Sequence, residues 1–192
     1  MRIVAGRHKG RAILAPPGEE IRPTSDRARE SLFNILAHGR LAKPDGTGPL
    51  HGAVVLDAFC GTGALALEAL SRGAVTAILM DSSPSALATA RVNLRALDEE
   101  AHATLVLADA VDPPAKGPSQ RPATLVFLDP PYRSGLGAPA LAALDRRGWI
   151  APEAVAVVES EARDAFDSPE DFTLLDERRY GKAKIRFLRK NG

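Results

Sequence analysis

The chain has 192 residues, of which 45% are hydrophobic and 26% are charged, which is typical of one globular domain with a substantial core. It contains no run of about twenty apolar residues, which argues against a membrane span, and its start lacks the apolar segment of a signal peptide. The single cysteine, Cys60, excludes an internal disulfide and favours a reducing compartment, so we expect a cytoplasmic protein in which Cys60 is a small packing residue.

The net charge of +1 conceals a strong segregation of charge along the sequence. Residues 1–43 carry nine Lys or Arg against four acids, and residues 176–192 carry seven against two. The middle of the chain carries nine basic residues against eighteen acids. Basic clusters are the electrostatic footprint of phosphate binding, although solvated surfaces also carry them, so other motifs must decide between the two interpretations.

The first predicted elements are a small β-hairpin and a helix. Two apolar triplets, 3–5 and 12–14, flank a basic segment and indicate the two arms of a hairpin with a basic tip. A helix with one apolar face is predicted next, with Thr24 or Ser25 as its N-cap and Asp26 in its first turn.

A strand, a glycine loop and a helix follow. The apolar run 53–56 leads into the loop Asp57-x-Phe59-x-Gly61-x-Gly63, and apolar residues at helical spacing come after it. The two glycines permit a tight turn and a close approach of the backbone to a ligand. The loop lacks the third glycine of a dinucleotide-binding motif, so by itself it is equally compatible with an ordinary turn.

Two further strands also end in acids. Strand 75–81 ends in Asp81, where an acid is placed to bind both hydroxyl groups of a ribose. Strand 103–108 is followed by Asp109 and Ala110.

The strand 124–128 and the turn Asp129-Pro130-Pro131-Tyr132 are the most informative segment. Two prolines fix the backbone and supply no N–H, so the turn is rigid. It opens at the carboxyl end of a buried strand, which is where open α/β sheets bind ligands. An acid, a carbonyl group and an aromatic ring on a stiff turn suit a flat group that bears an amine, such as a nucleobase or an amide.

Four successive strands therefore end in an acid, and one of them carries a glycine loop. Because loops are exposed to solvent, one or two acids at strand ends need no further explanation. All four acids together favour a ligand site. The four histidines show no metal-ligand spacing with the lone cysteine, so we predict no metal.

The remaining elements complete an α/β pattern. A helix is predicted from Ser83 and Pro84, the N-cap and the first helical position, and another near 136–147. Strands are predicted near 153–159, 172–177 and 183–188, of which the last two are closely spaced and antiparallel. We expect a mostly parallel seven-stranded sheet with an antiparallel final strand, preceded by the small hairpin and helix.

The order of these motifs resembles that of an S-adenosylmethionine-dependent class I methyltransferase with a Rossmann-like fold. The N-terminal block is more specific: the segment from Met1 to Arg11 and the motif Arg22-Pro23-Thr24-x-Asp26-Arg27-x-Arg29-Glu30 are similar to the RsmD family. The resemblance covers most of the chain and implies methylation of the exocyclic N2 of one guanine in bacterial 16S rRNA. Residues Cys60 and Thr62 in the glycine loop and the proline-rich stretch 112–122 are small departures.

The resemblance also implies a role for each motif residue. In the acceptor pocket, Asp129 and the carbonyl of Pro130 would hold the guanine amino group, Pro131 would stiffen the turn, and Tyr132 would stack on the base. The cofactor S-adenosylmethionine would lie along the residues Asp57, Phe59, Gly61, Gly63, Asp81, Asp109 and Ala110. Of these, Asp57 would approach the methionine amino group, Asp81 the ribose, and Asp109 with Ala110 the adenine. A simpler reading of Asp57 and Asp109 as caps of their own loops stays open.

The expected partner is 16S rRNA, naked or within a small-subunit particle. Candidate RNA contacts are Arg7, Lys9, Arg11, Arg22 and Arg27, with Lys182, Lys184 and Arg186 as a second group that alternation would place on one strand face. Residues 1–43 would form an RNA-binding extension, and residues 44–192 the methyltransferase domain. We expect a monomer that makes no contact with a membrane.

Two other classes of function stay open. A DNA adenine-N6 or protein glutamine-N5 methyltransferase uses a similar turn, although its first residue is often asparagine, whereas here it is Asp129. A non-catalytic RNA-binding assembly factor could keep the fold, but its motif residues would be free to decay, and here they are intact.

Overall fold

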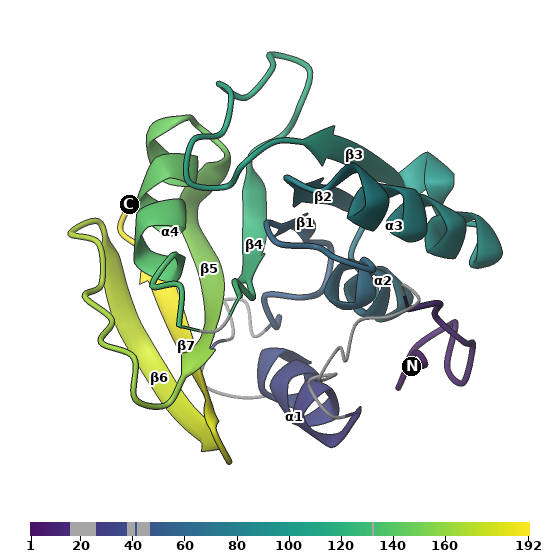
Figure 1. Ribbon diagram of the computed structural model, residues 1–192, viewed down its shortest axis with the longest axis horizontal. Helices are drawn as coiled ribbons and strands as arrows, with labels where there is room; N and C mark the ends of the chain where they lie inside the picture. The colour runs from purple at the N-terminus through teal and green to yellow at the C-terminus, as the bar shows by residue number, and fades with distance from the viewer. Residues whose placement is uncertain (16–25, 38–40, 42–46, 132) are drawn as a thin grey trace.

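The computed structural model describes residues 1–15, 26–37, 41, 47–131 and 133–192. Seven strands and four α-helices make up most of this part of the chain (Figure 1). The strands are β1 (Val54–Asp57), β2 (Thr76–Asp81), β3 (Ala103–Leu107), β4 (Ala123–Leu128), β5 (Ile150–Glu161), β6 (Phe172–Tyr180) and β7 (Ala183–Lys190). The helices are α1 (Asp26–Ala37), α2 (Ala64–Ser71), α3 (Pro84–Ala96) and α4 (Gly137–Arg146).

The strands form one sheet in the order β3-β2-β1-β4-β5-β7-β6. The first five strands of this order pair in parallel, and β7 is antiparallel to both of its neighbours. This confirms the predicted α/β class, the seven strands and the antiparallel final strand. Strand β5 is longer than predicted, since it begins at Ile150 and includes Pro152 before its regular pairing with β4 resumes at Val155.

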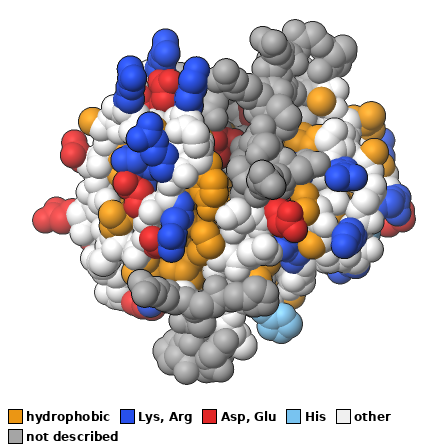
Figure 2. All heavy atoms as spheres, turned by 90° about the horizontal axis from the view of Figure 1, so that it is seen from below, with side chains coloured by type: hydrophobic (Ala, Val, Ile, Leu, Met, Phe, Trp, Pro, Cys, Tyr) orange, Lys and Arg blue, Asp and Glu red, His pale blue; other side chains and the backbone are white. Residues whose placement is uncertain are grey.

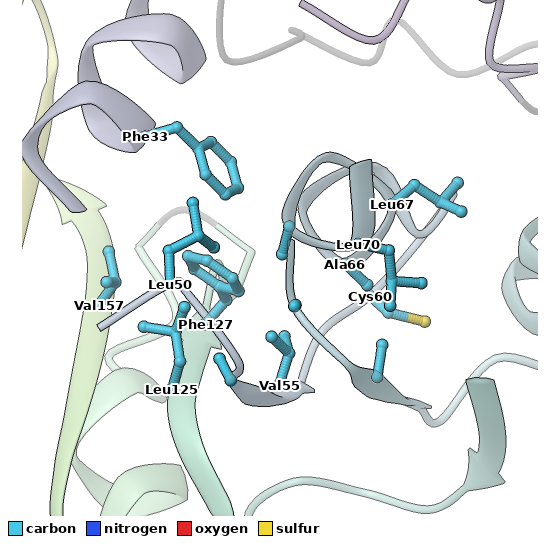
Figure 3. Packing of buried hydrophobic residues seen from close by; sticks show 14 of the residues in the cluster. Phe33, Leu50, Val55, Cys60, Ala66, Leu67, Leu70, Leu125, Phe127 and Val157 are labelled. Atoms are coloured by element: carbon cyan, nitrogen blue, oxygen red, sulfur yellow. The ribbon is translucent and has the colours of Figure 1, made fainter. Parts of the chain in front are cut away.

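Alternation along the strands divides the core into two layers. On one face, Val55, Leu125 and Phe127 pack with residues of α1, α2 and α3. On the other face, Val126 and Leu128 pack with α4 and the buried Trp149. Figure 3 shows the first layer, where Phe33 from α1 points toward Phe127 and the two rings lie 5.5 Å apart. Burial on both faces explains why the central strands are continuously apolar.

The N-terminal hairpin lies beside α2 and α3, at the opposite end of the molecule from β6 (Figure 1). It is present as one antiparallel bridge between Arg2 and Ala12 rather than as a pair of strands. The carboxylate of Glu68, which is fully buried in α2, accepts hydrogen bonds from the backbone N–H groups of Val4 and Ala5 at 2.8 and 3.0 Å. Isolated from α2, a hairpin this short would be marginal, so these contacts hold it in place.

Close packing also fixes the hairpin at Gly6. A Cβ atom at this position would lie 2.0 Å from the carbonyl oxygen of Ser71, and the φ angle of Gly6 is +83°, so only glycine fits without strain. The Ser71 hydroxyl donates to the carbonyl of Ala5, and the Ser71 carbonyl accepts from Arg7 N–H. The hairpin and the last turn of α2 therefore form one packed unit.

Helix α3 begins as the sequence predicts. Ser83 is its N-cap, and the Ser83 hydroxyl accepts a hydrogen bond from the N–H of Ala86 at 3.3 Å, with Pro84 in the first turn. The caps proposed for α1, Thr24 and Ser25, lie outside the described residues. No helix within the described ranges is both long and apolar enough to cross a membrane.

Strand order reverses between β1 and β4, and this reversal positions the site. Chain connections run outward from β1 through β2 to β3 on one side, and from β4 to β5 on the other. Helices α2 and α3 cover one face of the sheet and α4 covers the other. The loops after β1 and β4 therefore leave adjacent strands side by side and then turn toward opposite faces of the sheet. Crevices at such a reversal are where open α/β sheets bind ligands.

Candidate functional site

The glycine loop lies across the carboxyl ends of β1, β2 and β4. Its backbone is anchored on both sides, because Ala58 N–H donates to Phe127 O and Cys60 N–H donates to Met80 O, each at 3.0 Å. Gly63 ends the loop as the N-cap of α2 with a φ angle of +79°, and a Cβ there would lie 2.7 Å from Cδ2 of Leu79. Packing against Leu79 therefore requires glycine at position 63, whether or not a ligand approaches the loop.

Asp81 joins the glycine loop to the end of β2. Its Oδ2 accepts a hydrogen bond from Gly61 N–H, and its Oδ1 accepts one from Ser83 N–H, both at 2.9 Å. The carboxylate stays partly exposed. Through its two hydrogen bonds it holds the glycine loop and the start of α3 in a fixed arrangement.

Asp57 is buried at the end of β1, with 1% of its surface exposed. Its Oδ2 accepts a hydrogen bond from Ala66 N–H at 3.1 Å, whereas its Oδ1 is buried and has no partner among the described residues. Burial raises the pKa of this carboxyl to about 7; the Ala66 hydrogen bond opposes the shift, and the negative charge of Asp81 adds to it.

Asp109 and Ala110 follow β3. The Oδ1 of the exposed Asp109 accepts a hydrogen bond from Val111 N–H at 3.0 Å, so this carboxylate orders its own turn. Ala110 is buried in the layer that contains Met80. Asp109 and Asp57 each use one carboxylate oxygen to accept a backbone N–H from the segment that follows its strand, as the simpler interpretation expects. The second carboxylate oxygen of each residue is left for another donor.

The predicted acceptor residues lie at the end of β4, next to β1. Asp129 is partly buried, Pro130 is buried, Pro131 is exposed, and Tyr132 lies outside the described residues. Burial is the main cause that raises the pKa of Asp129 well above its usual range, and the negative charges of Glu159 and Asp57 raise it further. The Asp129 carboxylate is thus a stronger proton acceptor than an ordinary aspartate.

These residues fit the cofactor that the motifs imply. The orphaned Oδ1 of Asp57 is a buried acceptor that a ligand ammonium would satisfy. No described atom lies within 4 Å of a Cβ built on Gly61, whose φ angle is +51°, so this part of the loop borders open space. Phe59 is half-buried and packs against the layer under α4. Asp57, Asp81 and the glycine loop would hold S-adenosylmethionine, and Asp109 with Ala110 would flank its adenine.

The predicted RNA-contacting residues are placed only in part. Arg7 donates through Nε to Oε1 of Glu99 at 2.8 Å, Arg11 donates to the carbonyl of Ala96, and Lys9 is exposed at the hairpin tip. Arg22 lies outside the described residues, as does the side chain of Arg27.

Two residues of the second basic group, Arg186 and Lys182, differ from the prediction. Arg186 is only 5% exposed, and its guanidinium donates to Glu177 and Ser160 and stacks over the Phe166 ring at 4.6 Å. Strand β7 begins at Ala183, so Lys182 belongs to the turn before it. Alternation along a strand correctly groups Lys184 with Arg186, and both pair with Glu177, but it cannot reveal that neighbouring elements cover the strand.

Several buried polar residues that support the site were missed. Asn93 of α3 donates through Nδ2 to Thr62 O in the glycine loop and to Leu14 O in the N-terminal segment, at 2.9 and 3.0 Å. Glu68 anchors the hairpin, and Glu159 is buried at the end of β5. A charged or amide residue within an otherwise apolar run, as in Leu67-Glu68-Ala69, was the signal that could have identified them.

Known proteins are similar to this chain over almost its whole length. The family model described as Conserved hypothetical protein 95 matches residues 1–189. Ribosomal RNA small subunit methyltransferase D of Escherichia coli strain K12 is 35% identical over 191 residues, which cover 99% of this chain and 90% of that protein. The protein of the same name from Haemophilus influenzae is 32% identical over 187 residues, which cover 97% and 92%.

A solved structure agrees with the sequence comparisons. The Escherichia coli protein yhhF superposes with a TM-score of 0.80 at 34% identity, and the match covers 100% of this chain and 98% of that one. The motif residues, the sheet order and the match over nearly the full length lead to one assignment. The chain belongs to the Conserved hypothetical protein 95 family, the RsmD family that its motifs resemble.

Proposed function

We propose that this protein transfers a methyl group from S-adenosylmethionine to the exocyclic N2 of a guanine in bacterial 16S rRNA. The observation that carries the proposal is the juxtaposition of two loops at the reversal of strand order. Asp57 of β1 pairs in register with Phe127 of β4, so the glycine loop and the Asp129 turn leave the sheet side by side. Family membership supports the same reaction, since two relatives of this chain are named Ribosomal RNA small subunit methyltransferase D.

S-adenosylmethionine supplies an activated methyl group on a sulfonium, so the protein's main task is to align the acceptor nitrogen with it. The amino nitrogen of guanine is a poor nucleophile because its lone pair is delocalised into the ring. Hydrogen bonds from this amino group to Asp129 and to the Pro130 carbonyl would favour a pyramidal nitrogen whose lone pair faces the methyl group. The rigid Pro130-Pro131 backbone fixes both acceptors in advance.

The raised pKa of Asp129 contributes to the same step. Methyl transfer leaves a surplus proton on the nitrogen, and a carboxylate whose pKa is raised by burial accepts a proton more readily than an ordinary one. Two N–H donors from the bound base would in turn favour the ionised form of Asp129. Tyr132 would stack on the base, which has to leave its own stack to enter the pocket.

The cofactor-binding side positions the reaction. The buried Asp57 would face the methionine ammonium, and Asp81, already fixed by two backbone N–H groups, would bind the ribose hydroxyls. We assign residues 1–43 to an RNA-binding extension that acts with the methyltransferase domain, residues 44–192, in the bacterial cytoplasm. The basic residues Lys9, Arg22 and Arg27 are the candidate contacts for rRNA.

The test is to map the product. Purified protein would be incubated with methyl-labelled S-adenosylmethionine and either naked 16S rRNA transcribed without modification or small-subunit particles that lack the modification. Nucleosides from the digested RNA would be separated by mass spectrometry. We expect label in N2-methylguanosine at one position.

Duplex DNA and an unmodified protein mixture serve as competing acceptors in the same assay. Label in N6-methyladenine or in methylated glutamine would replace the proposal with one of those reactions. An absence of transfer to any acceptor, together with tight RNA binding, would identify a non-catalytic assembly factor.

A further inference from the structure

A basic hollow lies beside the acceptor turn, on the side opposite the N-terminal hairpin. It has a volume of about 480 Å³ and is lined mainly by Arg133, Glu161, Arg163, Asp164, Arg179 and Lys182. Arg133 follows the Asp129 turn, residues 161–164 lie at and after the end of β5, and the last two residues belong to the β6–β7 hairpin. Three segments that are far apart in sequence thus converge next to the proposed acceptor pocket.

The basic hollow is continuous with the acceptor turn. A second, smaller hollow is lined by Pro130, Pro131, Ser160 and Asp164, so Asp164 borders both spaces. A polymer whose base occupies the acceptor pocket would therefore have a flanking part of its backbone close to the basic hollow. Figure 2 shows Lys and Arg side chains gathered over the β6–β7 side of the molecule, on the left of that view.

The charges in the basic hollow are unevenly balanced. Oε2 of Glu161 accepts a hydrogen bond from Nε of Arg133 at 3.0 Å, and Oδ2 of Asp164 accepts one from the backbone N–H of Glu161 at 3.1 Å. Glu161 is therefore paired with a cation of another segment, and Asp164 accepts a hydrogen bond from its own segment. Arg163 and Lys182 are exposed, and neither makes an ion pair with any residue that the structure describes. Because Arg133 pairs with Glu161, three cationic side chains, Arg163, Arg179 and Lys182, remain against the one acid Asp164.

Backbone strain marks the same place. Arg133 has a φ angle of +61°, in the left-handed region that favours glycine, although its side chain is 82% exposed. Strained residues persist where the surrounding structure imposes them, and they are concentrated at ligand sites. Here the conformation places a guanidinium at the border between the acceptor turn and the basic hollow.

We propose that the basic hollow is a phosphate-binding subsite that holds the RNA backbone next to the extruded guanine. This inference rests on the proposed function and adds to it a second contact surface. Contacts to phosphate fix the register and orientation of a nucleic acid without reading its sequence. An extruded base needs such a grip on its flanking phosphates, because base stacking would otherwise pull it out of the acceptor pocket.

The test removes two of the three remaining cations of the basic hollow, Arg163 and Lys182, and leaves Arg179, which donates a hydrogen bond to the Gly181 carbonyl. The double variant Arg163→Ala/Lys182→Ala should weaken binding of 16S rRNA about tenfold at low salt, and the slope of log affinity against log salt should fall by about one to two. The loss should appear in KM for RNA, and the affinity for S-adenosylhomocysteine, measured by calorimetry, should stay within about twofold.

A matched control separates a local effect from a general loss of charge. Arg91→Ala/Arg146→Ala removes two exposed cations from α3 and α4, and the expected change in RNA affinity is under about twofold. The charge-preserving pair Arg163→Lys/Lys182→Arg should restore most of the lost affinity. Equal losses in the alanine variant and in the control, or no loss in the alanine variant, would overturn the subsite.

Filter binding of 16S rRNA measures the subsite independently of catalysis. If the wild-type protein binds RNA and the alanine variant does not, the subsite stands even where no methylated guanosine forms, and only the proposed reaction fails. If the wild-type protein methylates guanine and the alanine variant binds RNA equally well, the reaction stands and the subsite fails. A wild-type protein that binds no RNA overturns both.

Discussion

The two sides of the crevice use the same residue type in different ways. On the cofactor side, both carboxylate oxygens of Asp81 accept backbone N–H groups, so the acid shapes two loops before any ligand arrives. On the acceptor side, none of the described residues hydrogen-bonds to the carboxylate of Asp129, which burial and neighbouring acids hold at a raised pKa. The first arrangement fixes two loops in advance, whereas the second leaves a carboxylate open to donors, as its proposed role toward the guanine amino group requires.

The sharpest way to break this comparison is to remove the acceptor-side carboxylate. Asp129→Ala should lower turnover about a hundredfold or more. The guanine amino group loses its hydrogen-bond acceptor, and the methylated nitrogen loses the carboxylate that could take its surplus proton. The affinity for S-adenosylhomocysteine should change by less than about threefold, since this carboxylate serves the base rather than the cofactor. Single-turnover kinetics and calorimetry measure the two quantities; an unchanged turnover contradicts the assignment.

The cofactor side should show the reverse pattern. Asp81→Ala removes the acceptor for the ribose and leaves the N–H groups of Gly61 and Ser83 without their partner, so affinity for S-adenosylhomocysteine should fall about ten- to a hundredfold. Asp81→Asn retains one acceptor oxygen and should lose less. If calorimetry gives a wild-type affinity for the alanine variant, Asp81 does not bind the ribose.

Asp57 stands between the two sides, and its pKa makes a prediction about pH. Burial raises the pKa of Asp57 to about 7 from an unfolded value of 3.8, so between these two values the native protein holds a proton that the unfolded chain has lost. Stability from this group is therefore complete below pH 4 and is lost as the pH rises toward 7. The shift at Asp129 has the same sign.

The ligand-free protein should accordingly melt at a lower temperature at pH 8 than at pH 5.5. Asp57→Asn keeps the shape and the acceptor for Ala66 N–H but cannot ionise, so its melting temperature should depend less on pH, with the difference on the order of a few kcal/mol at most. Differential scanning calorimetry across this range measures the effect. Parallel pH profiles for the wild type and the variant would show that Asp57 ionises normally.

The smallest effect is expected at Asp109, where the two interpretations of a strand-end acid compete directly. If its carboxylate only caps the turn through Val111 N–H, then Asp109→Ala should reduce stability by about 1 kcal/mol and leave cofactor affinity unchanged. If it also accepts from the adenine amino group, affinity should fall about threefold to tenfold. Measuring the variant with adenosine- and inosine-containing forms of the cofactor product separates the cases, because inosine lacks that amino group.

The fold was predictable where the information is local. Continuous apolar runs, the glycine loop and the Ser83-Pro84 start of α3 each lie within a few residues, and the structure confirms them. The ends of β5 and β6 were less predictable, because pairing with β7 extends both strands past their apolar segments.

The site was predictable as a set of strand ends but not as a network. Asp81 reaches Gly61 across 20 residues, Glu68 reaches Ala5 across 63, and Asn93 reaches Leu14 across 79. No periodicity encodes such contacts, because only the finished sheet order brings the partners together. For the same reason, the sequence did not reveal that Arg186 is buried or that three distant segments meet to form the basic hollow.

The hydrogen bonds from the hairpin backbone to Glu68 limit which segments of this protein can be exchanged with those of another. The residues that hold the N-terminal hairpin in place come much later in the sequence: Glu68 and Ser71 lie in α2, Asn93 in α3, and Glu99 in the turn after α3. A transplant of the first fifteen residues onto a different methyltransferase would carry the basic tip without the side chains that hold it in place. A chimera should therefore exchange the hairpin together with α2 and α3, or introduce the residues that contact the hairpin into the host protein.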